Sequence, residues 1–171
     1  TSMAELELKI KKAIEQGYNH VYCMIDLDNK KKGKEKTDYV NLKKKYHGKH
    51  ISKPKKGIDC RIEFFETERC TELFFLYYFR YTSRSYEDQE SLLKDLNKNV
   101  EYRKAIDFFI KSKGLHSYFE RNGGSLIAAM GNANRSMEDK LANGREYTYS
   151  EIGRLIKEME DHRNEVCIIL A

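Results

Sequence analysis

The order of apolar and polar positions in the first third of the chain predicts a helix followed by two strands. Apolar residues recur at helical spacing from Ala4 to Gln16, which predicts an amphipathic helix. The segment Asn19–Ile25 is predicted to be a strand, and its unbroken apolar run, Val21–Ile25, is typical of burial on both faces in a parallel sheet. Residues 58–65 alternate between apolar and polar, which predicts a second strand with one more exposed face. Residues 29–57 form the connection, with a short helix expected at about 38–46.

The rest of the chain is predicted to be mainly helical. The segment 68–81 is apolar almost all round, so we expect it to be the central core helix, with Leu73, Phe74, Leu76, Tyr77 and Phe79 mostly buried. Further helices are expected at 89–98, 100–113, 124–142 and 149–162, and a last strand or packed tail at 165–170. At 171 residues the chain fits one domain. We therefore expect a single α/β domain over 1–171 with a small, mostly parallel sheet, flanking helices and a helical C-terminal half from about residue 85.

The positive charge of the chain is concentrated in one region. Between Lys30 and Lys56 there are twelve lysines against Glu35 and Asp38, a net of +10, whereas the whole chain carries +5. Such a cluster attracts phosphates by charge alone, without reading sequence. The alternative is a solvated loop whose lysines only keep it soluble. The lysines that we predict to contact the nucleic-acid backbone are Lys30, Lys31, Lys32 and Lys34.

The cysteines and the apolar runs indicate a cytoplasmic protein. The four cysteines at 23, 60, 70 and 167 form no CxxC pair, and three of them lie in apolar strand-like runs, where cysteine behaves as a small hydrophobic residue. We expect reduced thiols. No apolar run approaches membrane-spanning length and no signal peptide is visible, so no membrane association is expected.

Two carboxylates follow the first predicted strand. Asp26 and Asp28 come directly after five apolar residues, and ligands of parallel α/β sheets gather beyond the carboxyl ends of the strands. Residues two apart on an extended segment point the same way, so both carboxylates can share one cation. Mg²⁺ and Mn²⁺ prefer such oxygen ligands and help form a nucleophilic hydroxide. The alternative is a solvated strand end at which Asp28 starts a turn.

Glu72 is a further candidate catalytic residue. It is the one charged residue within CTELFFLYYF, in the first turns of the predicted core helix. A carboxylate is stabilised near a helix N-terminus, and a nearly buried one needs a partner. The structural alternative is a capping interaction or an ion pair with Arg69. The histidines at 20, 47, 50, 116 and 162 are scattered along the sequence and predict no site.

Three stretches together resemble the RloB family of prokaryotic defence proteins. HVYCMIDLDNK is similar to the family's strand ending in an aspartate-x-aspartate motif, and RIEFFETERCTELFFLYYF to its strand, loop and apolar helix, with Glu72 at the place of the family's glutamate. SLIAAMGNANRS and SEIGRLIKEMED resemble its last two helices. The resemblance implies a Toprim-like fold, a metal site at Asp26 and Asp28 supported by Glu72, and phosphodiester hydrolysis on nucleic acid in abortive infection. It also implies an ATPase partner protein, and a homo-oligomer is left open.

One element of the Toprim pattern has no counterpart in this sequence. Toprim proteins carry another glutamate after an earlier strand, typically followed by glycine, whereas the glutamates of residues 1–19 lie within the first predicted helix. We expect that the first strand–helix unit has been removed or that this member lacks it. Two aspartates leave most of a cation's coordination to water, so these 171 residues are expected to be a poor nuclease by themselves. The alternative function is a non-catalytic adaptor that binds nucleic acid or an acidic partner.

Overall fold

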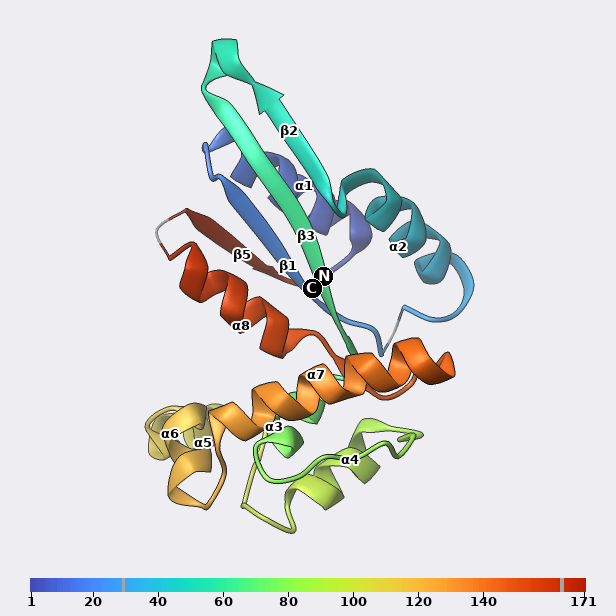
Figure 1. The fold of residues 1–171 in the computed structure, drawn as a ribbon, viewed down its shortest axis with the longest axis vertical. Coiled ribbons are helices and arrows are strands. Elements are labelled where there is room, and N and C mark those ends of the chain that lie inside the picture. The colour runs from blue at the N-terminus through green and yellow to red at the C-terminus, as the bar shows by residue number, and fades with distance from the viewer. Residues whose placement is uncertain (29, 164) are drawn as a thin grey trace. The chain divides into compact units, whose positions relative to one another are not determined.

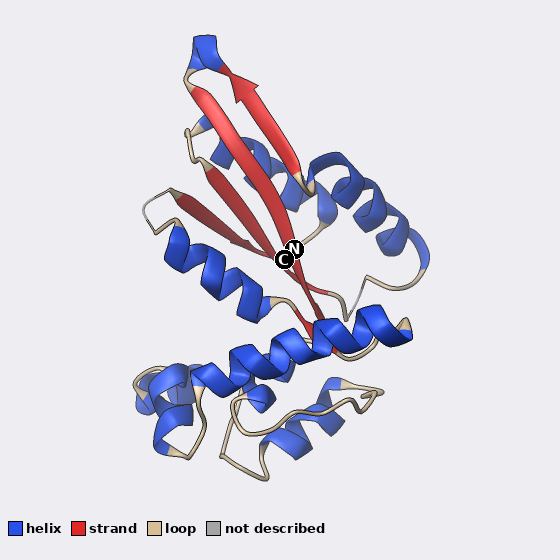
Figure 2. Cartoon of the chain, viewed as in Figure 1, coloured by secondary structure: helices blue, strands red, loops and turns tan. Residues whose placement is uncertain are grey.

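The computed structural model describes residues 1–28, 30–163 and 165–171, so Asn29, where the predicted basic connection begins, lies outside the described residues. The chain divides into two compact units. The first comprises Thr1–Glu66 together with Arg154–Ala171, and the second comprises Thr67–Gly153. Helices and strands alternate in the first unit, and the second is almost entirely helical (Figures 1 and 2). An α/β fold with a small sheet, flanking helices and a helical C-terminal half is therefore confirmed.

The sheet of the first unit has the strand order β2-β3-β1-β5. β1 (His20–Asp26) pairs in parallel with β5 (Val166–Leu170), so the predicted last strand is present. β3 (Ile58–Glu68) runs in the same direction as β1 and β5 (Figure 1), and its last two residues belong to the second unit. β2 (Lys49–Lys53) pairs antiparallel with β3 at the edge of the sheet. The prediction of a mostly parallel sheet is confirmed for β1, β3 and β5.

Strand β1 is covered on both faces, as its unbroken apolar run predicts. α1 (Met3–Glu15) packs its buried stripe against one face, while α8 (Ile152–Asp161) covers the other (Figure 1). Tyr22 of β1 and Phe65 of β3 form a core cluster with Leu155 of α8. Burying both faces fixes the direction of β1 and thereby the place where its last residue, Asp26, emerges.

The basic connection is more regular than predicted. α2 (Gly33–Tyr46) begins five residues before the expected helix and includes its whole range. β2 was not predicted, because its residues are mostly polar and exposed and an edge strand needs no apolar face. The hairpin closes through the short 3₁₀ helix η1 (Pro54–Lys56) and Gly57, whose φ of 65° is a conformation that glycine adopts without strain.

The predicted core helix at 68–81 is wrong in length: α3 extends only from Glu72 to Tyr77. The reason lies in β3, which continues to Glu68 because Thr67 and Glu68 pair with β4 (Tyr149–Ser150) within the second unit. The packing prediction for this segment is confirmed for Leu73, Phe74, Leu76 and Tyr77, which are buried, whereas Phe79 is half-buried.

The remaining helices of the second unit follow the predicted order with two changes. α4 (Gln89–Leu96) and α7 (Leu126–Asn143) match their predicted positions. The helix expected at 100–113 is replaced by α5 (Ile106–Ser112) and α6 (Leu115–Arg121), separated at Gly114, whose φ is 99°. The start of the helix expected at 149–162 is occupied by β4, and α8 begins at Ile152.

Asp95 of α4 is a buried carboxylate with four partners in the second unit. Its side chain is 5% exposed and accepts a hydrogen bond from the Tyr86 hydroxyl at 2.8 Å. The ammonium of Lys98 lies at 2.7 Å, the guanidinium of Arg80 at 3.1 Å and that of Arg84 at 3.2 Å. The pKa of Asp95 is lowered to about 2, mainly by the hydrogen bond from Lys98. The Tyr86 hydroxyl and the charge of Arg80 lower the pKa further, whereas burial acts to raise it. The charged form of Asp95 therefore stabilises the fold.

Replacing Asp95 by Asn is expected to lower the free energy of unfolding by about 2 kcal/mol near neutral pH. Because the folded pKa lies below the ordinary value, this contribution is complete above about pH 4 and is lost as the pH falls toward about 2. Urea unfolding of both proteins at several pH values measures it. The control is Glu90→Gln on the same helix, whose exposed pair with Lys94 contributes little at any pH. A loss from Asp95→Asn that does not shrink with acid would contradict this account.

Candidate metal site at the end of strand β1

Asp26 and Asp28 lie together where β1 ends. Asp26 is the last residue of the strand, and its backbone N–H donates to the carbonyl of Ala171 at 2.9 Å. The backbone N–H of Asp28 donates to Oδ1 of Asp26 at 3.2 Å, which closes an Asx turn. Both side chains are half-buried. The turn thus joins the Asp26 side chain to the Asp28 backbone at the carboxyl end of a strand that lies between β3 and β5.

Lys30 brings a positive charge to the same turn. Its ammonium donates to the backbone carbonyl of Asp26 at 2.7 Å, and the side chain is half-buried. Burial lowers the pKa of Lys30, against the opposing effect of the negative charges of Asp26, Glu35 and Asp28. Lys30 therefore holds the turn and partly neutralises its carboxylates, a role in the site that the sequence did not indicate.

The other three lysines predicted to contact nucleic acid lie at the start of α2. Lys31, Lys32 and Lys34 are exposed, and Lys32 is the N-cap residue of the helix. They follow the Asp26–Asp28 turn within a few residues of chain, in the same compact unit. Three exposed lysines thus follow the two carboxylates closely along the chain.

Glu66 is a buried carboxylate of the first unit to which the sequence analysis gave no role. It stands near the end of β3 and is 5% exposed. The Tyr39 hydroxyl donates to its Oε1, and the ammonium of Lys43 lies 2.5 Å from the same oxygen. Both partners belong to α2, so Glu66 fixes this helix, and with it the lysines at its start, against the sheet. The signal in the sequence was a glutamate directly after the apolar residues 64 and 65.

Glu72 belongs to the second unit and is almost fully buried there, with 2% of its surface exposed. The Tyr102 hydroxyl donates to its Oε1 at 3.2 Å, and the ammonium of Lys104 lies at 3.3 Å. Burial acts to raise the pKa of Glu72. Hydrogen bonds from the Cys70 thiol and from the backbone N–H of Glu72, together with the charge of Lys104, outweigh burial, so the pKa lies below its ordinary value. Glu72 is therefore ionised and supported inside its own unit. Its role in a catalytic site remains a prediction.

His20, His162 and Glu165 form a group whose possible metal-ligand atoms all lie within 4.8 Å of one another. Among the described residues, it is the one group of three or more His, Cys, Asp or Glu side chains that lie this close. Sequence reasoning missed it because His20 is far from His162 and Glu165 along the chain, and the pairing of β5 with β1 brings them together. The four cysteines are free thiols. Burial raises the pKa of Cys23 to about 12 and that of Cys60 to about 11, so both are protonated.

Comparison with known proteins identifies one relationship. A family model described as RloB-like protein matches residues 2–159. No curated protein and no solved structure matches the chain. Within the described part of the chain, no helix is long and apolar enough to cross a membrane.

Proposed function

Because the chain belongs to the RloB-like protein family, we propose that it serves prokaryotic anti-phage defence through metal-dependent hydrolysis of nucleic-acid phosphodiesters. The observation that supports this chemistry best is the pair Asp26 and Asp28 in one turn at the carboxyl end of β1. We place the protein in the cytoplasm, as its cysteine pattern indicates, and we infer an ATPase partner, as the resemblance to the family implies.

The residues of the turn fit a hard divalent cation. Carboxylate oxygens are the ligands that Mg²⁺ and Mn²⁺ prefer, and both ions retain several waters when few protein ligands are present. Two half-buried carboxylates in one turn repel each other, and a cation between them relieves that repulsion. Asp26 and Asp28 would hold the ion. When bound, it would polarise a phosphate oxygen and lower the pKa of a bound water.

The remaining candidate residues have supporting roles. Lys31, Lys32 and Lys34 would attract the nucleic-acid backbone and hold it by charge, while Lys30 keeps the turn in place through the Asp26 carbonyl.

The adaptor remains the second candidate function, and the exposed lysines at the start of α2 favour it. Binding by charge needs no metal and no carboxylate. The two functions differ in what the loss of Asp26 does. A nuclease loses metal-dependent cleavage in Asp26→Asn but keeps its affinity for nucleic acid, whereas an adaptor keeps the same properties in both proteins.

Replacing Lys31, Lys32 and Lys34 together by Gln is expected to weaken nucleic-acid binding and to flatten its dependence on salt. For duplex DNA the slope of log K against log salt falls by about 0.9 for each phosphate that a lysine no longer neutralises, so the triple variant should lower it by about 2–3. Fluorescence anisotropy with labelled DNA and RNA at several salt concentrations measures the slope.

The matched control for this experiment is Lys9→Gln/Lys11→Gln/Lys12→Gln on α1, which removes the same charge from three exposed lysines elsewhere in the first unit. Its salt slope should stay close to that of the wild type. If the slope of log K against log salt were equal in the wild type and in the Lys31/Lys32/Lys34 variant, nucleic acid would bind to another surface.

A further inference from the structure

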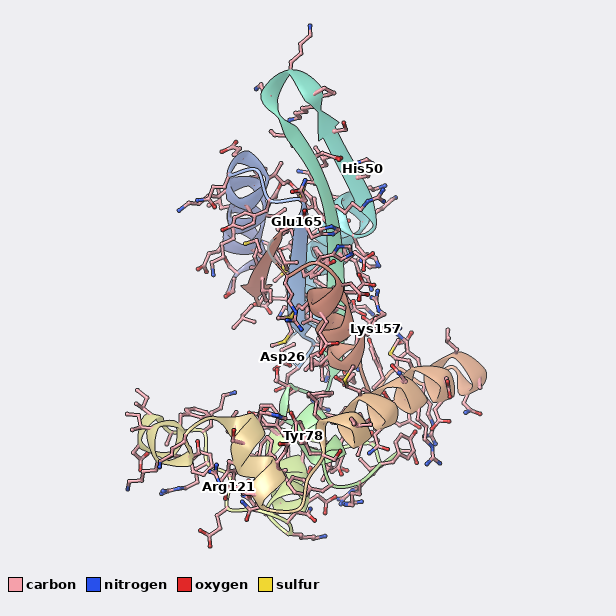
Figure 3. All side chains as sticks on the ribbon, turned by 60° about the vertical axis from the view of Figure 1, so that its left-hand side comes forward. Asp26, His50, Tyr78, Arg121, Lys157 and Glu165 are labelled. Carbon is pink, nitrogen blue, oxygen red and sulfur yellow. The ribbon has the colours of Figure 1, made fainter. Side chains whose placement is uncertain are left out.

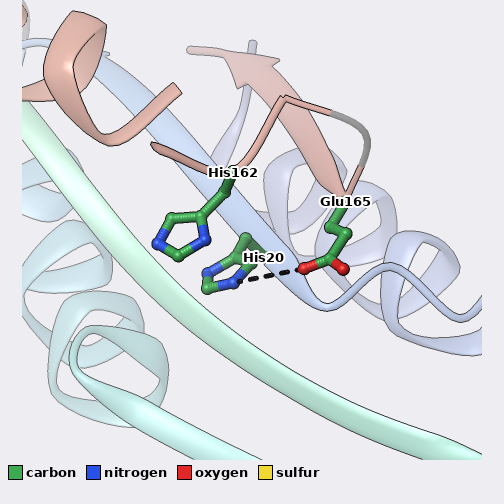
Figure 4. Close-up of side chains that lie close together, drawn as sticks. All are labelled: His20, His162 and Glu165. Atoms are coloured by element: carbon green, nitrogen blue, oxygen red, sulfur yellow. Dashed lines mark ion pairs between the residues drawn. The ribbon is translucent and has the colours of Figure 1, made fainter. Parts of the chain in front are cut away.

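His20, His162 and Glu165 form a cluster at one edge of the first unit (Figure 4). The imidazoles of His20 and His162 are stacked, with ring centroids 4.0 Å apart and an interplanar angle of 22°. Nε2 of His20 lies 4.0 Å from Oε2 of Glu165. Two imidazoles and a carboxylate thus present nitrogen and oxygen atoms to one small region.

The sheet itself brings the cluster together. His20 begins β1, and Glu165 directly precedes β5, whose first residue is the register partner of His20. The backbone N–H of His20 donates to the carbonyl of Glu165 at 3.0 Å, and the N–H of Glu165 donates to the carbonyl of His162 at 3.1 Å. His162 directly follows α8. Three backbone segments are therefore tied to one another at this point.

A second set of side chains orients the imidazoles. The Tyr22 hydroxyl lies 3.2 Å from Nδ1 of His20 and donates to Oε2 of Glu158 at 3.4 Å, and the same carboxylate oxygen lies 3.8 Å from Nε2 of His162. With the hydroxyl proton directed at Glu158, we assign to His20 the tautomer whose Nδ1–H donates to Tyr22. The lone pair of His20 is then on Nε2, the nitrogen nearest Glu165. A polar partner on the second ring nitrogen orients a metal-binding histidine, and Tyr22 and Glu158 take that place for His20 and His162.

The cluster is open enough to take an ion. His20 is 14% exposed, His162 36% and Glu165 57%. The cluster is thus closed on the side of β1 and reachable from solvent on the side of Glu165.

We propose that His20, His162 and Glu165 bind a divalent transition-metal ion, Zn²⁺ in the first instance, at a site separate from Asp26 and Asp28. Two imidazoles and one carboxylate are a donor set that zinc takes, and they suit Mg²⁺ poorly, because Mg²⁺ prefers oxygen ligands. Zinc–ligand bonds are about 2.0–2.2 Å long, which puts tetrahedral ligand atoms about 3.4 Å apart. Ligand atoms that lie within 4.8 Å of one another therefore need to approach by at most about 1.4 Å. The exposed Glu165 and the position of His162 beyond the end of α8 allow this adjustment together with rotation of the stacked rings.

The two sites lie at opposite ends of the same strand. His20 is the first and Asp26 the last of the seven residues of β1, a separation of about 20 Å at the rise of a strand. Figure 3 labels Asp26 and Glu165 toward the two ends of the strand. A zinc ion at His20 would join the end of α8 and the start of β5 to β1, and would stabilise the first unit because the unfolded chain does not preform the site. This proposal does not depend on the proposed nuclease activity.

Calorimetric titration of the full chain with ZnCl₂ tests the site. The expected result is one zinc ion per chain, with the dissociation constant raised at least about tenfold in His162→Ala and in Glu165→Gln. The control is His116→Ala. Like His162, His116 pairs with a glutamate four residues away in the sequence, but it has no second histidine beside it. Its zinc affinity should equal that of the wild type. Zinc should raise the melting temperature of this control and not that of His162→Ala.

Two variants and a spectroscopic measurement keep the test decisive. Circular dichroism shows whether His162→Ala folds, and Glu165→Gln, a change at a largely exposed side chain, tests the same site if it does not. Co²⁺ in place of zinc should give the visible bands of nitrogen and oxygen ligands. Absence of zinc binding by the wild type, equal affinity in the wild type and in both variants, or a thiolate-to-cobalt charge-transfer band from cysteine ligands would each overturn the proposal.

Discussion

Truncation of Phe119 to alanine is expected to lower the free energy of unfolding by about 3–5 kcal/mol, the range for a well-packed buried aromatic. Phe119 of α6 is 1% exposed and is the centre of an aromatic cluster in the second unit. Aromatic pairs at these separations contribute beyond the burial of their area, and a void among five rings cannot close without moving all of them. The rings whose centroids lie within 6.5 Å of that of Phe119 are those of Phe75, Tyr78, Phe79, Tyr102 and Tyr118.

Urea or thermal unfolding of the purified variant measures this loss. The control is Ile127→Ala, since Ile127 of α7 is 85% exposed and its truncation should change the unfolding midpoint little. Phe119→Leu fills part of the volume and should fall between the wild type and Phe119→Ala. A midpoint for Phe119→Ala close to that of the Ile127 control would show that the cluster does not hold the second unit together.

Replacing both Asp26 and Asp28 by Asn is expected to abolish the response of the protein to Mn²⁺. Asn keeps the shape of each side chain and the oxygen that accepts the Asp28 N–H, so the turn survives, but both negative charges that attract the cation are gone. In the wild type, Mn²⁺ should raise the melting temperature. Any cleavage of DNA or RNA by the wild type should depend on Mn²⁺. The double variant should show neither effect while retaining its nucleic-acid affinity.

The control for this double variant is Asp88→Asn/Asp107→Asn, which removes two exposed aspartates of the second unit. It should respond to Mn²⁺ as the wild type does. An equal Mn²⁺ response in the wild type and in the Asp26/Asp28 variant would remove the basis for a metal site at the end of β1.

The sequence was sufficient where apolar residues follow a clear period. The stripe that includes Leu6 and Ile10 predicts α1, and the unbroken run from Val21 to Ile25 predicts a strand buried on both faces, because burial in those elements depends on local pattern alone. It also placed Asp26 and Asp28 at a strand end, since charged side chains that follow a buried apolar run mark the point where the strand leaves the core.

The remaining features depend on pairing between distant segments, which a local pattern does not contain. β2 is recognisable only from its partner β3, and α3 starts late because Glu68 pairs with Tyr149. For the same reason the contact of His20 with Glu165 could not be predicted: it exists because β5 returns beside β1. The environment of Glu72, with Tyr102 and Lys104 as partners, likewise required the folded second unit.

Calorimetric titration of Mn²⁺ into the wild type and into Asp26→Asn tests the central claim, a divalent-cation site at the end of β1. The proposal predicts one Mn²⁺ per chain with an affinity at least about tenfold weaker in Asp26→Asn, equivalent to about 1.4 kcal/mol or more. Glu165→Gln in the same experiment should bind Mn²⁺ at this site as the wild type does, which separates it from the His20 cluster. Equal Mn²⁺ affinity in the wild type and in Asp26→Asn, or loss of binding in Glu165→Gln alone, would contradict the assignment.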